Sequence, residues 1–373
     1  MEKLLKKLQE RERNSNLRSL VQERDKIDFF SNDYLGLAGN IQLQQTITHY
    51  FSTFCGKVNG STGSRLLAGN TAYFEIVEQK LATLFNAEKC LLFNSGYNAN
   101  LAILSAVPQK GDTILYDALI HASLIDGARL SFAKRYSFLH NDLEDLERLL
   151  KKAEGEKYVV AEAVYSMDGD FAPVKALTGL CEKYSAHLII DEAHSTGIWG
   201  NKGSGLCCSL GLEEKIFARV HTFGKAMGIH GACIVGSETL IDFLINFARP
   251  FIYTTALPLH CLVAVEKAFE YLQENIQVQK EIKEKIETFL SFSGNYSLGA
   301  ALIPSKSPIQ AVRIQGNTAA KKIAATLVKA GYEVRAILSP TVKAGEERLR
   351  ICLHTYNTIE EIKGLVQKIG TIV

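Results

Sequence analysis

The sequence lacks the motifs of several common protein classes. Its eight cysteines form no CxxC pair, so neither a zinc site nor a disulfide framework is indicated, and reduced thiols in a cytosolic protein are expected. It contains no GxxxxGK[ST], no GxGxxG after the first strand and no GxSxG, which argues against a P-loop protein, a dinucleotide-binding protein and a serine hydrolase. No run is long and apolar enough to cross a bilayer, and the N-terminus lacks the apolar core of a signal peptide. We therefore expect a cytoplasmic protein without a membrane partner.

The remaining composition is that of an ordinary globular protein, with 47% hydrophobic and 22% charged residues. A net charge of +2 gives no reason to expect nucleic acid as a partner. At 373 residues the chain is too long for one simple core, and we expect a large domain with a smaller one. The predicted division is an N-terminal helical arm over 1–37, a large domain over 38–262 and a small domain over 263–373. An amphipathic helix is predicted from Met1 to about Gln22.

Two polar residues stand just past predicted strands. Residues 186–194 start as an apolar run and end on acid and imidazole, which is typical of a buried parallel strand with Asp191 at its carboxyl end. A second run, 216–223, leads to Lys225. Ligands bind at this edge of open α/β sheets. A lysine that forms a Schiff base and a carboxylate that keeps a pyridine nitrogen protonated suit pyridoxal phosphate (PLP) chemistry. A helix cap and a solvated surface lysine would give the same two residues, so this pattern alone leaves both interpretations open.

The surrounding segments resemble the α-oxoamine synthase family of fold-type I PLP enzymes. They are DEAHSTG at 191–197 and TFGKA at 222–226, and the resemblance runs from about Asn32 to Leu353. It implies an α/β fold of the PLP-dependent transferase type, aspartate aminotransferase-like, with a mostly parallel seven-stranded central sheet and a smaller α+β C-terminal domain. It also implies an enzyme that condenses an amino acid with an acyl thioester and releases carbon dioxide.

The resemblance assigns catalytic roles to four side chains. Lys225 would hold PLP and, once released, remove the α-proton of the amino acid. Asp191 would bind the pyridine nitrogen, and His194 the phenolic oxygen of PLP. His121, in the DALIHAS segment at 117–123, would stack on the face of the pyridine ring.

Further cofactor contacts follow in the same way. Gly96 and Tyr97 open a predicted helix, and free N–H groups at a helix N-terminus bind phosphate. The resemblance gives this role to their backbone, adds Thr222 as a phosphate contact, and makes Ser166 of the SMDGD motif a cofactor contact. Asp168, in the same motif, is interpreted as a residue that orders the loop, and no metal is predicted.

The implied assembly is a homodimer with shared active sites. Thr254 and Thr255 lie in a segment that resembles one whose threonine reaches the phosphate of the partner subunit. The glycine-rich loop at 60–65 resembles a family loop that helps to build the site at the dimer interface. Each active site would then need two chains.

Four residues are predicted to bind substrate. The resemblance gives Arg350 the role of clamping the amino-acid carboxylate, and charge-assisted pairing of arginine with carboxylate suits that role. Arg18 is the candidate for the family's arginine that meets the substrate carboxylate, and Asn32 lies in the family's entry motif. Thr341 lies in an SPTV segment that resembles the PPT loop of the family, with Ser339 in place of the first proline.

Within the family, the TFGKA and DEAHSTG segments look closest to the branch that joins L-alanine to a pimeloyl thioester in biotin synthesis. Glycine C-acetyltransferase and serine palmitoyltransferase activities remain alternatives. A non-catalytic PLP-fold binding protein is a further alternative, against which the intact Lys225 and Asp191 count. The sequence leaves open the acyl chain length and whether the thiol is coenzyme A or a carrier protein.

Overall fold

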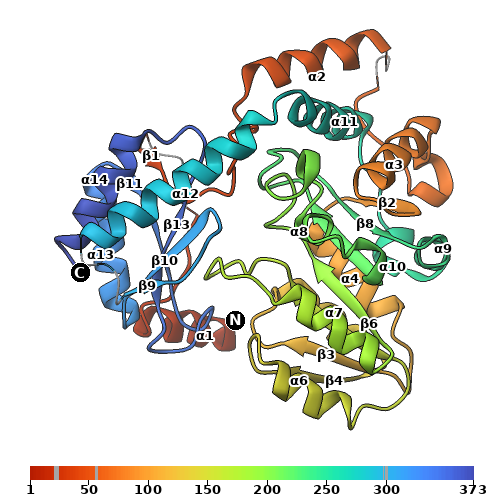
Figure 1. Cartoon of the computed structure of the whole chain (residues 1–373), viewed down its shortest axis with the longest axis horizontal. Helices are drawn as coiled ribbons and strands as arrows, with labels where there is room; N and C mark the ends of the chain where they lie inside the picture. Colours follow the sequence, from red (N-terminus) through yellow and green to blue (C-terminus); the bar gives the residue numbers. More distant parts are fainter. Residues whose placement is uncertain (21–24, 55–57, 297, 299–300) are drawn as a thin grey trace. The chain divides into compact units, whose positions relative to one another are not determined.

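The computed structural model describes residues 1–20, 25–54, 58–296, 298 and 301–373. This part of the chain forms two compact units (Figure 1). Unit 1 consists of Met1–Tyr34, Ser166–Asp170 and Lys280–Val373, and unit 2 consists of Leu35–Tyr165 and Phe171–Gln279. These units do not follow the predicted division at 37/38 and 262/263, which stays a prediction about domains. One helix, α11 (Leu259–Glu274), runs through 262/263 and packs on the unit 2 helices α2 and α3.

Unit 2 is built on a seven-stranded sheet with the order β2-β8-β7-β6-β5-β3-β4. Strands β4, β3, β5, β6 and β7 run parallel to one another, and β8 is antiparallel to both β2 and β7. The predicted mostly parallel seven-stranded sheet is therefore confirmed. The strands are β2 (Lys89–Phe93), β3 (Thr113–Asp117), β4 (Lys134–Phe138), β5 (Lys157–Glu162), β6 (Ala186–Asp191), β7 (Ala218–Thr222) and β8 (Ala232–Gly236).

Helices connect these strands. α4 packs against α5 and against β7 and β8, while α6 packs against α7 and β4, so the sheet is screened by helix pairs. The helices of unit 2, besides α11, are α2 (Ile41–Phe54), α3 (Ala72–Leu84), α4 (Gly96–Ala106), α5 (Ala122–Leu130), α6 (Leu143–Leu150), α7 (Val174–Lys183), α8 (Leu206–Ser209), α9 (Glu238–Phe247) and α10 (Arg249–Ile252). Short turns of π-helix (Arg65–Gly69) and 3-10 helix (Asn201–Gly203, Glu213–Lys215) complete the unit.

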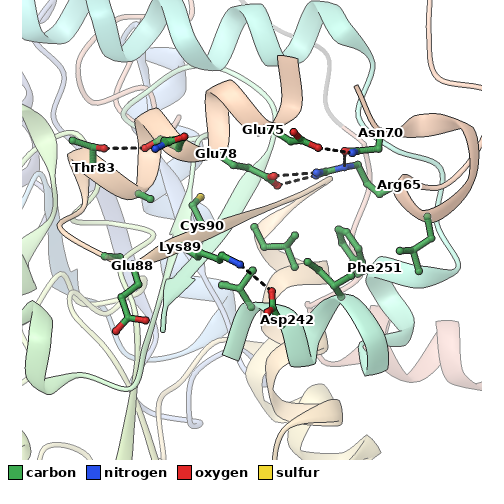
Figure 2. Close-up of a pocket in the computed structure, with 17 residues that line it drawn as sticks. Arg65, Asn70, Glu75, Glu78, Thr83, Glu88, Lys89, Cys90, Asp242 and Phe251 are labelled. Carbon is green, nitrogen blue, oxygen red and sulfur yellow. Dashed lines mark hydrogen bonds and ion pairs between the residues drawn. The ribbon is translucent and has the colours of Figure 1, made fainter. Parts of the chain in front are cut away.

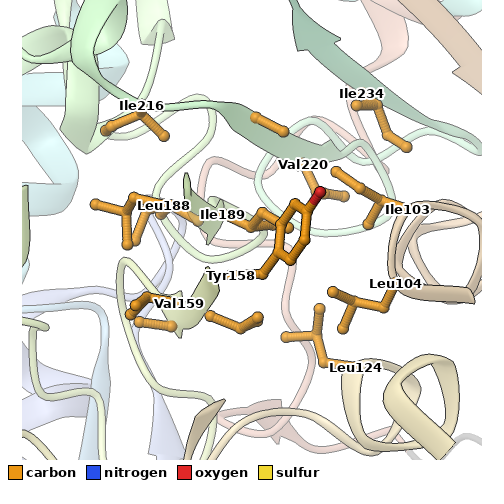
Figure 3. Packing of buried hydrophobic residues seen from close by; sticks show 14 of the residues in the cluster. Ile103, Leu104, Leu124, Tyr158, Val159, Leu188, Ile189, Ile216, Val220 and Ile234 are labelled. Carbon is orange, nitrogen blue, oxygen red and sulfur yellow. The ribbon is translucent and has the colours of Figure 1, made fainter. Parts of the chain in front are cut away.

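The core of unit 2 lies where α4 meets the middle of the sheet (Figure 3). Ile103 comes from α4, Val159 from β5, Ile189 from β6 and Val220 from β7, and all four side chains are fully buried. Strands covered on both faces are expected to be apolar along most of their length. In β5 and β6 the acidic side chains stand at the carboxyl ends, as Glu162 and Asp191, at the edge where open α/β sheets bind ligands.

Unit 1 is a smaller α+β unit. A four-stranded antiparallel sheet has the order β12-β13-β10-β9, and β1 pairs in parallel with β11 as a separate two-stranded sheet. The strands are β1 (Ile27–Asp28), β9 (Leu302–Ile303), β10 (Ile309–Arg313), β11 (Tyr332–Glu333), β12 (Arg335–Ile337) and β13 (Arg348–Cys352). The helices are α1 (Glu2–Arg13), α13 (Asn317–Lys329) and α14 (Ile359–Gly370), while α12 (Gln277–Asn295) begins in unit 2 and continues in unit 1.

The N-terminal helix is shorter than the sequence pattern predicts. α1 ends at Arg13, Ser15 has a positive φ of 53°, and residues 16–20 are not helical, so the prediction is wrong for 14–20. Asparagine and serine side chains compete with the helix for backbone hydrogen bonds. The side chain of Asn16 instead donates a 2.9 Å hydrogen bond to the carbonyl of Ser339. Gln22, the predicted end of the helix, lies outside the described residues.

Among the described residues, no helix is both long enough and apolar enough to cross a membrane. In the same part of the chain, no three His, Cys, Asp or Glu side chains are grouped as metal ligands. Cys55 lies outside the described residues, and the other seven cysteines are free thiols.

Candidate active site

Asp191 is the last residue of β6 and its side chain is buried. Nδ2 of Asn100, from α4, donates a 2.7 Å hydrogen bond to Oδ2 of Asp191, and the backbone N–H of Ala193 donates a 2.8 Å bond to Oδ1. Each carboxylate oxygen can accept more than one hydrogen bond. Asp191 can therefore receive one further donor, such as a protonated ring nitrogen, at the edge of the sheet where ligands bind.

His121 lies close to Asp191 through a hydrogen-bonded connection. It is the N-cap of α5, and Nδ1 accepts a 3.2 Å hydrogen bond from the backbone N–H of Ser123. Oγ of Ser123 lies 2.7 Å from the same Nδ1 and 2.9 Å from Nδ2 of Asn100. Burial lowers the pKa of His121 below its ordinary value; the Asp191 carboxylate opposes this shift and the charge of Lys225 adds to it.

Glu162 is a site residue that the sequence reasoning missed. It ends β5 directly beside Asp191 in the sheet register, and its side chain is buried. Burial raises the pKa of Glu162 well above its ordinary value, and the neighbouring Asp191 carboxylate adds to the rise. Its Oε1 has no hydrogen-bond partner among the described residues. The sequence did contain a sign of this role: Glu162 follows an apolar run, as Asp191 follows the apolar run of the next strand.

The N-terminus of α4 forms a cradle with the end of β7. Ser95 caps α4, and its Oγ accepts a 3.3 Å hydrogen bond from the N–H of Asn98. The N–H groups of Gly96 and Tyr97 lie in the first turn of α4, where no preceding helical carbonyl can accept their hydrogen bonds. A Cβ on Gly96 would lie 2.2 Å from Cγ2 of Thr222, so only glycine fits against that threonine. Oγ1 of Thr222 is buried without a hydrogen-bond partner among the described residues.

Lys225 and His194 lie in the loops that follow β7 and β6. Lys225 is half-buried, and its carbonyl accepts a 2.8 Å hydrogen bond from the N–H of Gly228, which closes a turn. The charge of Lys225 acts on both His121 and Glu162, so the amine belongs to the same cluster. His194 is buried in the turn after β6. The structure thus brings together, in unit 2, most of the residues predicted to bind the cofactor.

The predicted threonines after α10 contact Asn94, which lies just before α4 in their own chain. Nδ2 of Asn94, two residues before Gly96, donates hydrogen bonds of 3.1 Å to Oγ1 of Thr254 and 2.8 Å to the carbonyl of Thr255. The N–H of Ala256 donates a 2.9 Å bond to the carbonyl of Gly63, in the glycine-rich loop. Sequence reasoning did not single out Asn94 for a role of its own.

The predicted substrate residues lie in unit 1. The guanidinium of Arg350, on β13, is buried and donates to neutral acceptors. They are the carbonyl of Ser166 at 2.6 Å, Oδ1 of Asn32 at 3.0 Å, Sγ of Cys352 at 2.9 Å and the hydroxyl of Tyr34 at 3.4 Å. Arg350, Asn32 and Ser166 are thus brought together, with Ser166 bound through its backbone. Ser166 belongs to unit 1, unlike the other predicted cofactor contacts.

Arg18 and Thr341 also meet in unit 1. Nη2 of Arg18 donates a 3.2 Å hydrogen bond to Oγ1 of Thr341, and both residues are exposed. Nearby, Asp168 forms an ion pair with Arg348, which agrees with the predicted loop-ordering role of Asp168.

A cleft of about 530 Å³ in unit 2 lies beside α3 and holds none of the predicted site residues (Figure 2). Arg65 forms a bidentate ion pair with Glu78, with N–O distances of 2.8 and 3.0 Å, and donates a 2.8 Å bond to Asn70. Lys89 pairs with Asp242 at 3.2 Å. These charged side chains of the cleft contact one another, so we interpret them as a network that stabilises the fold.

Comparison with known sequences defines the class of this protein. The pattern of the Aminotransferase class I and II family matches residues 24–369, which is most of the chain. The predicted resemblance to fold-type I PLP enzymes is thereby confirmed.

Relatives within that class narrow the assignment. An 8-amino-7-oxononanoate synthase of Emericella nidulans is 40% identical, with 92% of this chain and 89% of that protein covered. The synthase of Chromohalobacter salexigens is 39% identical over 92% of this chain and 89% of its own. The chain belongs to the 8-amino-7-oxononanoate synthase family.

Solved structures agree with this assignment. An 8-amino-7-oxononanoate synthase of Francisella tularensis superposes with a TM-score of 0.80 at 30% identity, covering 94% of this chain and 98% of that one. A serine palmitoyltransferase of S. paucimobilis, solved with a bound PLP–myriocin aldimine, gives a TM-score of 0.90 at 26% identity, covering 99% and 96%.

Proposed function

We propose that this chain is a PLP-dependent acyltransferase that condenses L-alanine with a pimeloyl thioester to give 8-amino-7-oxononanoate, carbon dioxide and the free thiol, in biotin synthesis. Relatives that are 40% and 39% identical and carry that name support the proposal. The observation that carries it is the cluster in unit 2, where Asp191, His121, Glu162 and Lys225 act on one another beside the N-terminus of α4.

The residues of this cluster fit PLP. A phosphate needs donors, and α4 offers the first N–H groups of a helix, with the helix dipole favouring an anion. The buried hydroxyl of Thr222 has no partner among the described residues and can donate to the same phosphate. A Cβ on Gly96 would fill the cradle and meet Thr222 at 2.2 Å. Asp191 supplies an acceptor for the pyridine nitrogen.

When bound, PLP supplies an aldehyde that captures amines and a ring that accepts electrons from the α-carbon. Lys225 supplies the amine that holds the cofactor and, once released, accepts the α-proton of the amino acid at Nζ. Its position past the end of β7, in a turn closed by Gly228, keeps the amine at the open edge of the sheet.

The remaining side chains of the cluster orient the cofactor and adjust its charge distribution. Asp191 offers its carboxylate to the pyridine nitrogen, and Asn100 and Ala193 orient that carboxylate by hydrogen bonds. We assign His121 to the face of the ring and His194 to the phenolic oxygen, as predicted from sequence. Neutral His121 suits stacking on a cationic ring, because an imidazolium there would be repelled.

For the substrates, we assign the amino-acid carboxylate to Arg350, with Asn32 as its neighbour. The guanidinium donates to neutral acceptors, so these contacts leave its charge for an anion. Arg18 and Thr341, which bond to each other, are the second proposed substrate contact.

We also propose a homodimer. Leu67 is 85% exposed, Leu66 is 49% exposed and Tyr253 is 73% exposed, and these side chains flank the glycine-rich loop and the Thr254 segment. Apolar side chains this exposed indicate a surface that another chain covers. Cross-linking or light scattering of the purified protein tests this part.

An absorbance titration of the purified protein tests the function. PLP-loaded protein is mixed with L-alanine, glycine or L-serine, each with an acyl-thioester analogue. A new long-wavelength band that is strongest with L-alanine supports the proposal. A band with L-serine instead would assign a serine palmitoyltransferase-like activity, which the TM-score of 0.90 to such an enzyme keeps as the second candidate. A protein that cannot be reconstituted with PLP would refute the catalytic proposal.

A further inference from the structure

A chain of hydrogen bonds joins Asp191 to His121 through two residues that the sequence did not single out. Nδ2 of Asn100 lies 2.7 Å from Oδ2 of Asp191 and 2.9 Å from Oγ of Ser123. Oγ of Ser123 lies 2.7 Å from Nδ1 of His121. Asn100, Ser123 and Asp191 are all buried. The connection therefore runs from the buried carboxylate through two buried residues to the exposed residue His121.

The direction of donation follows from the chemistry of the groups. An ionised carboxylate only accepts, so the amide nitrogen of Asn100 must face Asp191, and this sets the orientation of the amide. The two protons on Nδ2 then serve Asp191 and Ser123, one each. Oγ of Ser123 accepts from Asn100, and its single proton is left to donate to Nδ1 of His121.

The tautomer of His121 follows from this direction. Nδ1 receives the hydroxyl of Ser123 at 2.7 Å and the backbone N–H of Ser123 at 3.2 Å. A ring nitrogen that accepts hydrogen bonds carries a lone pair and no proton. The neutral imidazole of His121 then has its proton on Nε2.

The position of Asn100 argues that this chain of bonds does more than hold α4 in place. Asn100 stands on the buried face of α4, between Ala99 and the core residues Ala102 and Ile103. Its Oδ1 is buried without a partner among the described residues. Burying a polar atom without a partner costs stability, and an apolar side chain would avoid that cost.

We propose that Asn100 and Ser123 are positioning residues that connect Asp191 to His121 and hold His121 as the neutral tautomer with its proton on Nε2. The catalytic meaning of this inference rests on the proposed function. A neutral ring stacks on a cationic pyridine without repulsion, and its Nε2–H is oriented as a donor for an oxygen of the ligand. The hydrogen bond from Asn100 also orients the carboxylate of Asp191.

The first experiment reads the tautomer directly in the PLP-free protein. Histidine labelled with ¹⁵N is incorporated, and the ring nitrogens of His121 are observed by NMR at pH 7.5, assigned by loss of the signal in His121→Gln. We expect an unprotonated Nδ1 and a protonated Nε2. A proton on Nδ1, or on both nitrogens, would overturn the proposal. No cofactor is present, so failure to bind PLP in a separate experiment would refute the proposed function and leave this result standing.

The second experiment breaks the connection. In Ser123→Ala the neutral form of His121 loses a donor, so its titration midpoint should rise by about 0.5 pH unit or more. Ser123→Thr keeps a hydroxyl and should titrate as the parent does. Ser131→Ala is the matched control, because it removes another buried serine of the same region, whose hydroxyl bonds to the carbonyl of Pro108 at 3.0 Å.

The third variant acts at the other end. Asn100→Leu keeps the volume of the buried position and removes the bond to Asp191. PLP affinity should fall about tenfold, since a hydrogen bond to a charged group is worth at least that factor. If Ser123→Ala and Ser131→Ala titrate alike, or if Asn100→Leu binds PLP as the parent does, the two residues serve only to fill the core, and the proposal is wrong.

Discussion

The cleft beside Arg65 and the cluster around Asp191 both lie in unit 2, but their charged side chains have different kinds of partner. In the cleft, cation meets carboxylate: Arg65 and Glu78 share two contacts of 2.8 and 3.0 Å. Asp191 instead receives hydrogen bonds from the neutral amide of Asn100 and the N–H of Ala193. A directly paired charge has its field cancelled, whereas a charge held by neutral donors keeps a field that acts on a bound molecule. The presence of a cleft lined by charged side chains therefore does not by itself identify the reactive site.

The largest effect on the reaction rate is expected from replacing Lys225, the lysine of the cluster around Asp191. Lys225→Ala should lower the rate of condensation by about 10³-fold or more, because in the proposed mechanism Lys225 both holds the cofactor and acts as the base. The rate of thiol release with L-alanine and a pimeloyl thioester measures this. Lys89→Ala, a lysine of the cleft, is the control and should turn over normally. Appreciable condensation by Lys225→Ala would remove Lys225 from the mechanism.

The next effect tests the field of the carboxylate. Asp191→Asn keeps the size of the side chain and removes its charge, so kcat should fall by about 10²-fold while the protein stays folded. Asp242→Asn makes the same change in the cleft and should leave kcat unchanged, since Asp242 pairs with Lys89 at the surface. Equal losses in the two variants would erase the contrast between the regions.

The third prediction concerns stability: the Arg65–Glu78 ion pair should contribute more to it than the exposed Lys89–Asp242 pair. Arg65→Ala leaves the largely buried Glu78 without its cation, and the free energy of unfolding should fall by about 3 kcal/mol. Lys89→Ala breaks an exposed pair and should cost less than about 1 kcal/mol. Urea midpoints of the two variants measure the difference. Similar midpoints would mean that the Arg65 pair contributes no more than a surface pair.

The phosphate cradle permits a test by rescue. In Gly96→Ala the new Cβ meets Cγ2 of Thr222 at 2.2 Å, and PLP affinity should fall about tenfold as α4 shifts. Adding Thr222→Ser removes Cγ2 and keeps the hydroxyl, so the double variant should recover most of the affinity. Fluorescence titration of the cofactor-free protein gives the dissociation constants. A double variant as weak as Gly96→Ala would show that the clash is not the cause.

The smallest effect concerns Glu162, whose pKa burial raises well above its ordinary value. The folded state then keeps a proton that the unfolded state has lost, so stability falls as pH rises above the unfolded pKa. The slope contributed by this one group is at most about 1.4 kcal/mol per pH unit. Glu162→Gln should remove this slope and stabilise the protein more at pH 8 than at pH 5. Glu182→Gln, at an exposed site, should show no such difference in its urea midpoints.

The sheet and the ends of its strands were predictable from local pattern. An apolar run that ends on Asp191, and another that leads to Lys225, predicted two strands with a polar residue at or just past each carboxyl end, and these strands are β6 and β7, which pair in parallel. The carboxyl ends of parallel neighbours meet at one edge of the sheet, which is the edge where the sequence predicted that a ligand binds.

The supporting residues were not predictable in this way. Asn100, Ser123 and Glu162 acquire their roles from the packing of α4 on α5 and from the register of β5 with β6, which join residues far apart in the chain. The local signs were limited to an asparagine among the apolar residues of α4 and a glutamate at the end of an apolar strand. The error at residues 14–20 has the same origin, because Asn16 bonds to Ser339, a partner more than 300 positions away.

The segment Ser166–Asp170 belongs to unit 1, although the residues on either side of it belong to unit 2. This arrangement has a practical consequence for the design of fragments. A fragment that begins at Lys280 would lack Asp168, the ion-pair partner of Arg348, and strand β1, which pairs with β11. No single cut point therefore yields unit 1 as a complete piece. Chimeras that exchange this unit between synthases need four crossovers: one after the N-terminal segment, one on each side of the SMDGD motif, and one within α12.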